Sequence, residues 1–277
     1  MNSSDQQLVT SNQQAFMESL LVIKIGGNII DDDQKLAAFL DEFASVAGRK
    51  ILVHGGGKLA TKLAAQLGVE QQMIDGRRIT DIETLRIVTM VYAGYVNKSI
   101  VASLQNLGID AIGLCGADGN LIKAHKRNHP TIDYGFVGDV DEINVSLLQT
   151  LLEKNISVVV APITHDAKGQ LLNTNADTIA QEIAKSLSKK YLVQLIYSFE
   201  KSGVLRNVED ENSVIKQIDS TSYKKLKADQ TIFAGMIPKL DNAFTALQSG
   251  VKKVIIGKAE ELKNLIEGYA GTTIIDE

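Results

Sequence analysis

Residues 20–27 read Leu-Leu-Val-Ile-Lys-Ile-Gly-Gly and carry the clearest structural signal in this 277-residue chain. A short apolar run that one lysine interrupts and two glycines end is typical of a central parallel strand covered by helices on both faces. A second strand at 51–53 ends in His54-Gly55-Gly56-Gly57, and apolar residues at helical spacing follow the two strands at 34–47 and 58–67. This strand–helix–strand–helix order predicts right-handed crossovers and a parallel sheet.

The rest of the chain continues the same alternation. Further strands are expected at 110–114, 156–161, 191–196, 251–256 and 272–275, and further helices at 81–107, 175–187 and 238–247. Hairpins are expected at 116–142 and at 69–80, the latter around Asp75-Gly76, and a polar surface excursion at 200–217. The predicted fold class is α/β: an open, mainly parallel central sheet sandwiched by helices, which the two halves of the chain share.

The amino-acid composition argues against several classes of protein function. The 29 Lys and Arg residues stand against 33 Asp and Glu, a net charge of −4, which argues against nucleic-acid binding. Cys115 is the only cysteine and the four histidines lack metal-ligand spacing, so no protein-built metal site is expected. No apolar run of about 18 residues occurs and the first 19 residues lack signal-peptide order, which predicts a cytoplasmic protein without a membrane span.

Two glycine turns are candidate anion sites. Lys24 inside a buried strand is costly unless its ammonium reaches water or an anion at the strand end, where Gly26 and Gly27 let backbone N–H groups approach a ligand. Gly55-Gly56-Gly57 opens a helix and forms a second cradle for phosphate or carboxylate. A snorkelling lysine before an ordinary turn explains the first feature about equally well.

The second glycine turn also allows a different interpretation. Residues 55–60 match G-x-G-x-x-A, a variant of the dinucleotide fingerprint, and Asp75 lies 20 residues further on. However, the acidic residue should end an apolar strand, and the preceding VEQQMI is a poor one. An NAD(P)-dependent dehydrogenase therefore stays a remote alternative.

Three further motifs carry polar groups. Gly76-Arg77-Arg78-Ile79-Thr80 offers a guanidinium fork suited to a carboxylate, although two solvated arginines are the plain alternative. Asn173-Thr174-Asn175-Ala176-Asp177 precedes a helix that Asn175 could cap. In Gly235-Met236-Ile237-Pro238-Lys239 the lysine falls in a first helical turn, where the dipole disfavours a cation unless an anion binds there. Positioned cations without a nucleophile pattern favour phosphoryl transfer.

These five motifs, in this order, resemble the amino acid kinase family, and within it the branch that phosphorylates N-acetylglutamate. The resemblance extends from about residue 20 to the C-terminus. It implies that ATP, with Mg²⁺ bound through its phosphates, phosphorylates the side-chain carboxylate of an N-acetyl- or N-succinyl-glutamate in arginine biosynthesis. It further implies a lobe at 1–170 for the acyl amino acid and dimerisation, and a lobe at 171–277 for ATP.

The resemblance also implies a role for each motif residue. Lys24 and Lys239 would stabilise the transferred phosphoryl group, and Asp177 would orient both lysines. The other implied contacts fall in three groups: substrate-binding Gly56, Gly57, Arg78 and Asn173; phosphate-binding Gly26, Gly27 and Gly55; and nucleotide-binding Ser202, Gly203, Gly235 and Met236. No metal ligand is assigned.

The chain departs from the family pattern in two places. The nucleotide segment Ser198-Phe199-Glu200-Lys201-Ser202-Gly203 lacks the usual aspartate, and Ala234-Gly235 replaces Asp-Gly. Arginine-inhibited members carry an N-terminal helix and a Gly-x-Gly-Thr signature, whereas this chain has a short polar lead and Ala270-Gly271-Thr272, so we expect an arginine-insensitive homodimer. The alternatives are another carboxylate or carbamate kinase of the same fold, or a non-catalytic amino-acid sensor.

Overall fold

The computed structural model describes residues 17–74, 77–229, 231–232 and 236–276. Its centre is an eight-stranded sheet in the order β12-β14-β13-β11-β1-β2-β8-β5. The strands are, in chain order, β1 (Ser19–Ile25), β2 (Arg49–His54), β5 (Ala111–Leu114), β8 (Ser157–Val160), β11 (Leu192–Phe199), β12 (Gln217–Ile218), β13 (Lys253–Lys258) and β14 (Thr272–Ile274). Only the β13–β14 pair is antiparallel among these, so the predicted mainly parallel sheet shared by both halves is confirmed.

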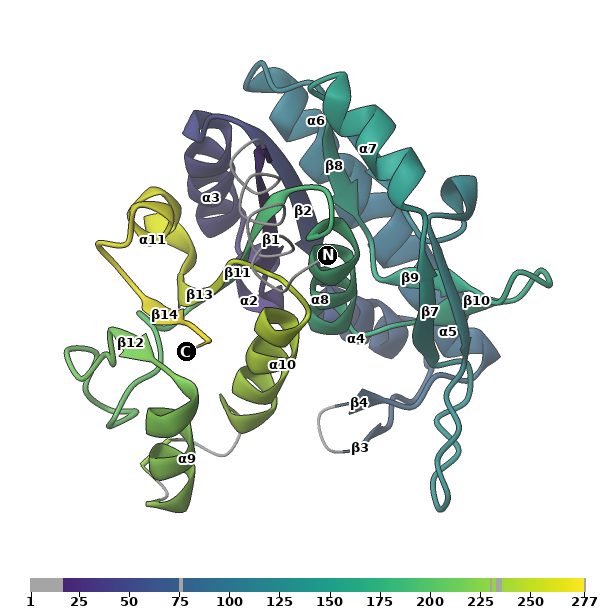
Figure 1. Ribbon diagram of the computed structural model, residues 1–277. Coiled ribbons are helices and arrows are strands. Elements are labelled where there is room, and N and C mark those ends of the chain that lie inside the picture. Colours follow the sequence, from purple (N-terminus) through teal and green to yellow (C-terminus); the bar gives the residue numbers. More distant parts are fainter. Residues whose placement is uncertain (1–16, 75–76, 230, 233–235, 277) are drawn as a thin grey trace, which may run out of the picture.

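Helices cover both faces of this sheet (Figure 1). Alternate β1 side chains explain the two cores: Leu20 and Val22 pack into one, and Leu21 and Ile23 into the other. The first face carries α7 (Val145–Glu153), α8 (Ala176–Leu187), α9 (Ser220–Ala228) and α10 (Ile237–Gln248). The second carries α2 (Gly27–Ile30), α3 (Asp33–Ser45), α4 (Gly57–Gln66), α5 (Ile82–Thr89), α6 (Asn97–Asn106) and α11 (Leu262–Glu267).

Two smaller sheets lie beside the main one. β10 (Leu171–Asn173), β9 (Ile163–His165), β6 (Ile122–Lys126) and β7 (Gly138–Ile143) form a four-stranded sheet in that order. β3 (Met73–Ile74) and β4 (Arg77–Arg78) form a separate hairpin. The predicted hairpins in both regions are thus present, while the Asp75-Gly76 turn lies outside the described residues.

The long helix predicted at 81–107 is interrupted in its middle. A π-helical segment, Met90–Val96, joins α5 to α6, and Asp81 caps the start of α5 by accepting from the Thr84 backbone N–H. By length and composition alone, the helical stretch Ile82–Asn106 could span a membrane. Core helices of soluble proteins meet the same criterion, and 44% of its most apolar window is buried inside the molecule, so the evidence for a span is weak.

The sequence analysis did not anticipate α7, α9 and α11. Each is short, between six and nine residues, and α11 has only two buried side chains, Leu262 and Leu265. Short helices carry too few apolar positions to show a clear helical period. The surface excursion at 200–217 is largely irregular, yet Val204, Leu205 and Ile215 are buried, so it packs against the body of the protein.

Candidate active site

Three neighbouring strands end at one edge of the sheet. β1 lies between β11 and β2, and the carboxyl ends of the three strands lead into Gly26-Gly27, Glu200 and Gly55-Gly56. Ligands of open α/β sheets bind at this edge, where the chain turns away to opposite faces of the sheet. The structure therefore brings the first two sequence motifs together.

Lys24 reaches the site because of its strand register. It shares a face of β1 with Leu20 and Val22, the face that α8 covers. Asp177 lies in the first turn of α8, and Asn175 caps that helix by accepting from the backbone N–H groups of Asp177 and Thr178. The Lys24 ammonium is thereby 2.7 Å from Oδ1 of Asp177, and the lysine side chain is only 13% exposed.

Lys239 approaches the same carboxylate from the neighbouring helix. Its Nζ donates to Oδ2 of Asp177 at 3.1 Å, from the first turn of α10. Burial alone would raise the pKa of Asp177, but the two lysines outweigh it and lower the pKa to about 2. A permanently ionised carboxylate thus holds two ammonium groups at the sheet edge, with a net local charge of one positive unit.

The two glycine turns lie against each other, and the second turn leaves no room for a side chain at Gly56. A Cβ on Gly55 would be 3.9 Å from the backbone N of Gly27. Gly56 has φ +146°, and a Cβ there would be 2.9 Å from the Tyr92 ring. At Gly56 only glycine avoids both the clash and the strained backbone, and Gly55, Gly56 and Gly57 all line the pocket described next.

A pocket of about 480 Å³ opens at these turns. Its walls include most of the residues that the motifs singled out, namely Lys24, Gly27, Gly55, Gly56, Gly57, Arg78, Asn173 and Asp177. Their convergence from four separate segments is an observation that the sequence could not supply. Lys239 joins the group through Asp177.

Arg78 and Asn173 contribute two further polar groups to the pocket wall. The Arg78 Nη2 donates at 2.9 Å to the Gly57 carbonyl and to Thr61 Oγ1, which fixes the guanidinium beside the second glycine turn. The Asn173 amide donates to Thr80 Oγ1 at 3.0 Å. The arginine and the amide therefore face the pocket from the hairpin and from β10, as donors suited to a carboxylate.

The sequence analysis missed four polar residues of the pocket wall: Lys58, Thr61, Tyr92 and Arg127. Arg127 is mostly buried and held by Asp139, to which its Nε donates at 3.0 Å. Tyr92 stems from the π-helical segment, and burial raises the pKa of its hydroxyl. Lys58 directly follows the second glycine turn, whereas no motif marks the other residues, which reach the pocket through helix geometry and tertiary packing.

Three of the residues expected to bind nucleotide, Ser202, Gly203 and Met236, are not on the wall of this pocket. Ser202 Oγ donates to Glu211 at 2.9 Å, and a Cβ on Gly203 would meet Thr272 at 2.7 Å. Met236 precedes α10, and Gly235 lies outside the described residues. Gly26 is also absent from the pocket wall. Its N–H donates to the Ser198 carbonyl at 3.0 Å.

His54, buried in β2 ahead of the second glycine turn, contacts the Gly55 carbonyl through Nδ1 at 2.7 Å and the Asn97 amide through Nε2 at 3.2 Å. Burial lowers its pKa to about 4. The ring is thus neutral and structural.

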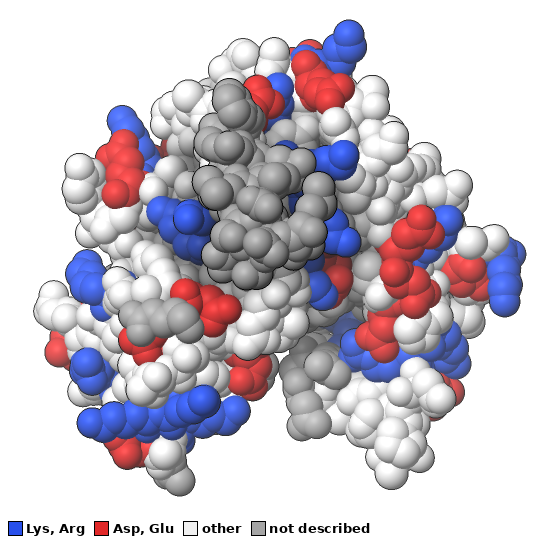
Figure 2. All heavy atoms as spheres, in the orientation of Figure 1, with Lys and Arg blue, Asp and Glu red and all other residues white. Residues whose placement is uncertain are grey.

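Charge on the surface is mixed, and Figure 2 shows acidic and basic side chains side by side on the face of the molecule that is turned to the viewer.

The sheet and the site define an α/β protein that presents two lysines, one carboxylate and two glycine turns to an anionic ligand. The sequence model of the amino acid kinase family matches residues 19–258, and the chain belongs to that family. The dehydrogenase alternative is excluded accordingly. In addition, the segment after α4 forms a hairpin instead of the second sheet strand that a dinucleotide site needs.

Relatives and solved structures agree with this assignment. The chain is 54% identical to an acetylglutamate kinase of Parabacteroides distasonis over 89% of this chain and 96% of that protein, and 55% identical to one of Cytophaga hutchinsonii over 90% and 95%. Carbamate kinase from Giardia shares the fold, with a TM-score of 0.68 at 16% identity, over 95% of this chain and 100% of the other. So does N-acetylglutamate synthase from Neisseria gonorrhoeae, with a TM-score of 0.79 at 20% identity; this chain is matched in full but spans only 64% of that protein.

Proposed function

We propose that the protein transfers the γ-phosphoryl group of ATP to the side-chain carboxylate of N-acetylglutamate, in arginine biosynthesis. The observation that carries the proposal is the placement of Lys24 and Lys239 on either side of Asp177, at the edge of a glycine-lined pocket. The acetylglutamate kinases that this chain resembles at more than half identity support the same reaction.

The mechanism is one of electrostatic stabilisation. Negative charge spreads over the oxygens of the transferred phosphoryl group, and preorganised cations lower the energy of that state. Lys24 and Lys239 supply these cations from opposite sides, while Asp177 fixes their separation and accepts no proton because its pKa is about 2. The backbone N–H groups of Gly27 and Gly55 are proposed to hold the phosphates, whereas the Gly26 N–H, also expected there from the sequence, is already bonded to the Ser198 carbonyl.

The acceptor is proposed to lie between the second glycine turn and the hairpin. Gly56, Gly57, Arg78 and Asn173 would bind the α-carboxylate and the acyl group, which leaves the side-chain carboxylate directed at Lys24. Residues 1–170 would accordingly serve the acyl amino acid, and residues 171–277 the nucleotide. A non-catalytic amino-acid sensor would tolerate the loss of Lys24, Asp177 or Lys239. The chain retains all three, which favours the enzyme over the sensor.

ATP is proposed to approach from the α10 side, with Ser202, Gly203, Gly235 and Met236 near its nucleoside. Among the described residues, no group of three His, Cys, Asp or Glu side chains could hold a metal ion. Mg²⁺ would therefore reach the site on the ATP phosphates, where it neutralises part of their charge. The cytoplasmic location stays a sequence-based prediction.

Arg127 bears on the choice between an acetyl and a succinyl group. It lies on the pocket wall, and Asp139 binds its Nε and Nη2, whereas Nη1 makes no hydrogen bond among the described residues. A terminal carboxylate on the acyl group could accept from this nitrogen. N-succinylglutamate is therefore the second acceptor to assay.

A homodimer is proposed to form through the π-helical segment. Met90 and Tyr95 are 55% and 71% exposed there, beside a shallow apolar hollow that includes Leu59 and Leu63 of α4. Large apolar side chains on one face mark protein–protein contacts. A two-fold pairing of this helix would cover them in an isologous interface.

The test of the reaction is ADP release with purified protein, Mg²⁺ and ATP, with N-acetylglutamate, N-succinylglutamate, glutamate, aspartate or carbamate as the acceptor. The proposal expects turnover with an N-acylated glutamate and only background release with the other acceptors. Equal turnover with free glutamate or carbamate would assign the chain to another reaction of the family.

A further inference from the structure

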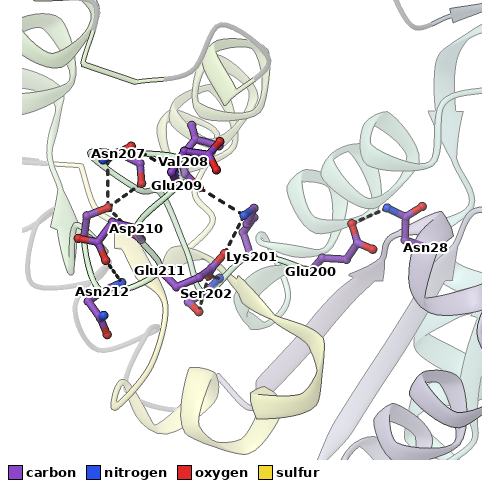
Figure 3. Close-up of polar contacts among 11 residues, drawn as sticks. Asn28, Glu200, Lys201, Ser202, Asn207, Val208, Glu209, Asp210, Glu211 and Asn212 are labelled. Atoms are coloured by element: carbon purple, nitrogen blue, oxygen red, sulfur yellow. Dashed lines mark hydrogen bonds and ion pairs between the residues drawn. The ribbon is translucent and has the colours of Figure 1, made fainter.

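The two sides of the site are joined by a side-chain contact that no motif contains. The Asn28 amide donates a hydrogen bond to the Glu200 carboxylate (Figure 3). Asn28 follows Gly27 directly, and Glu200 follows the end of β11. The contact therefore links the phosphate-side glycine turn to the first residue of the nucleotide-side loop.

Glu200 is the member of its loop that turns toward the site. The next two residues are held by another carboxylate, since Lys201 Nζ is 2.7 Å from Glu211 Oε1 and Ser202 Oγ donates to Glu211 Oε2 at 2.9 Å. Figure 3 shows Glu200 pointing to Asn28 while Lys201 and Ser202 meet Glu211. Contacts within the loop therefore hold Lys201 and Ser202, whereas the Glu200 carboxylate bonds to the glycine turn through Asn28.

The glycine turn needs such support because α2 is a single turn. Its N-cap residue Gly26 makes no side-chain cap bond, and its anchoring side chains Ile29 and Ile30 are buried on the far side. The Gly26 N–H bond to the Ser198 carbonyl holds the first residue of the turn. Asn28, two residues further on, also contacts the β11 side, through its hydrogen bond to Glu200.

We propose that Asn28 and Glu200 are positioning residues for the nucleotide phosphates: their hydrogen bond holds the Gly27 amide toward the phosphoryl group. This inference rests on the proposed phosphoryl transfer. It also gives a role to Glu200, which lies in the segment where the family's usual aspartate is missing. An N–H that is preorganised toward the developing charge acts without reorganisation during the reaction.

The experiment compares Glu200→Gln, which keeps an acceptor oxygen, with Glu200→Ala, which removes it. Both variants lose the negative charge of Glu200, so they differ only in the acceptor and the side-chain length. Asn28→Ala removes the donor without any charge change. Glu209→Ala, in the same loop, is the matched control, because the Glu209 side chain makes no hydrogen bond among the described residues. We measure kcat, the KM for ATP and for the acyl amino acid, and ADP affinity by calorimetry.

We expect Glu200→Ala and Asn28→Ala to lower kcat and kcat/KM for ATP about threefold to tenfold, the loss of roughly one hydrogen bond to the transferred group. The KM for the acyl amino acid should stay within about twofold, as should every constant of Glu200→Gln and Glu209→Ala. Equal behaviour of Glu200→Ala and Glu200→Gln, or a wild-type Asn28→Ala, would overturn the proposal. Failure of the proposed function shows separately, as wild-type protein without acceptor-dependent ADP release.

Discussion

Lys24 Nζ lies 2.7 Å from Oδ1 of Asp177, so the first strand of the sheet is joined to the first turn of α8 by an ion pair. The pair is largely shielded from solvent, with the two side chains 13% and 20% exposed. A buried pair of this kind gives little net stability when intact, because desolvation offsets the attraction. Its value lies in holding a cation where an anionic ligand can reach it.

The first prediction concerns the two lysines. Lys24→Ala and Lys239→Ala should each lower turnover by a factor on the order of 10² or more, since each removes a cation that acts mostly in the transition state. Asp177→Asn should lower turnover as well, because neither lysine then has a fixed partner. Steady-state ADP release measures all three, and turnover within about twofold of wild type for either lysine variant would refute the assignment.

The second prediction separates the acceptor from the nucleotide. Arg78→Lys should raise the KM for the acyl amino acid severalfold and leave the KM for ATP unchanged, because a point-charge ammonium cannot reproduce a planar guanidinium contact. Arg86→Lys is the matched control, as Arg86 is 65% exposed and pairs with Glu83 on its own helix. A raised KM for ATP alone would place Arg78 on the nucleotide side.

The third prediction is a pH dependence of stability from His54. Burial lowers its pKa from 6.5 to about 4 in the folded chain, so between these values the unfolded chain binds more protons. The free energy of unfolding should therefore be highest above pH 6.5 and fall by about 2 kcal/mol from pH 6.5 to 5.

Urea unfolding at several pH values measures this dependence. His54→Gln should lose that part of the slope, whereas His129→Gln, at an exposed histidine, should keep it. An identical slope in wild type and His54→Gln would show that His54 titrates normally.

The fourth prediction concerns assembly. Tyr95→Lys should convert the dimer to a monomer, because a desolvated ammonium at the centre of an isologous contact has no partner. Tyr269→Lys is the control, an equally exposed tyrosine near the opposite edge of the sheet. Sedimentation velocity with and without millimolar arginine measures the mass. A wild-type monomer, or an arginine-dependent hexamer, would contradict the proposed interface.

Much of the architecture is readable from local pattern. The apolar run before Gly26-Gly27 could only be a buried strand, and the glycine turns after β1 and β2 mark the ligand edge because parallel strands end together. Five ordered motifs sufficed for the family, and Asn175 was recognisable as a helix cap from its type and position. These features depend on neighbours in sequence, so the chain alone determines them.

Tertiary packing decided the rest. Asp177 forms ion pairs with Lys24 and Lys239 only because β1, α8 and α10 meet at one edge. Arg127, Tyr92 and the Asn28–Glu200 contact carry no local signal, and the π-helical segment interrupts a helix whose sequence reads as continuous. The physical reason is that apolar periodicity records which side of an element is buried, whereas the distance between two polar groups depends on how whole elements are placed in space.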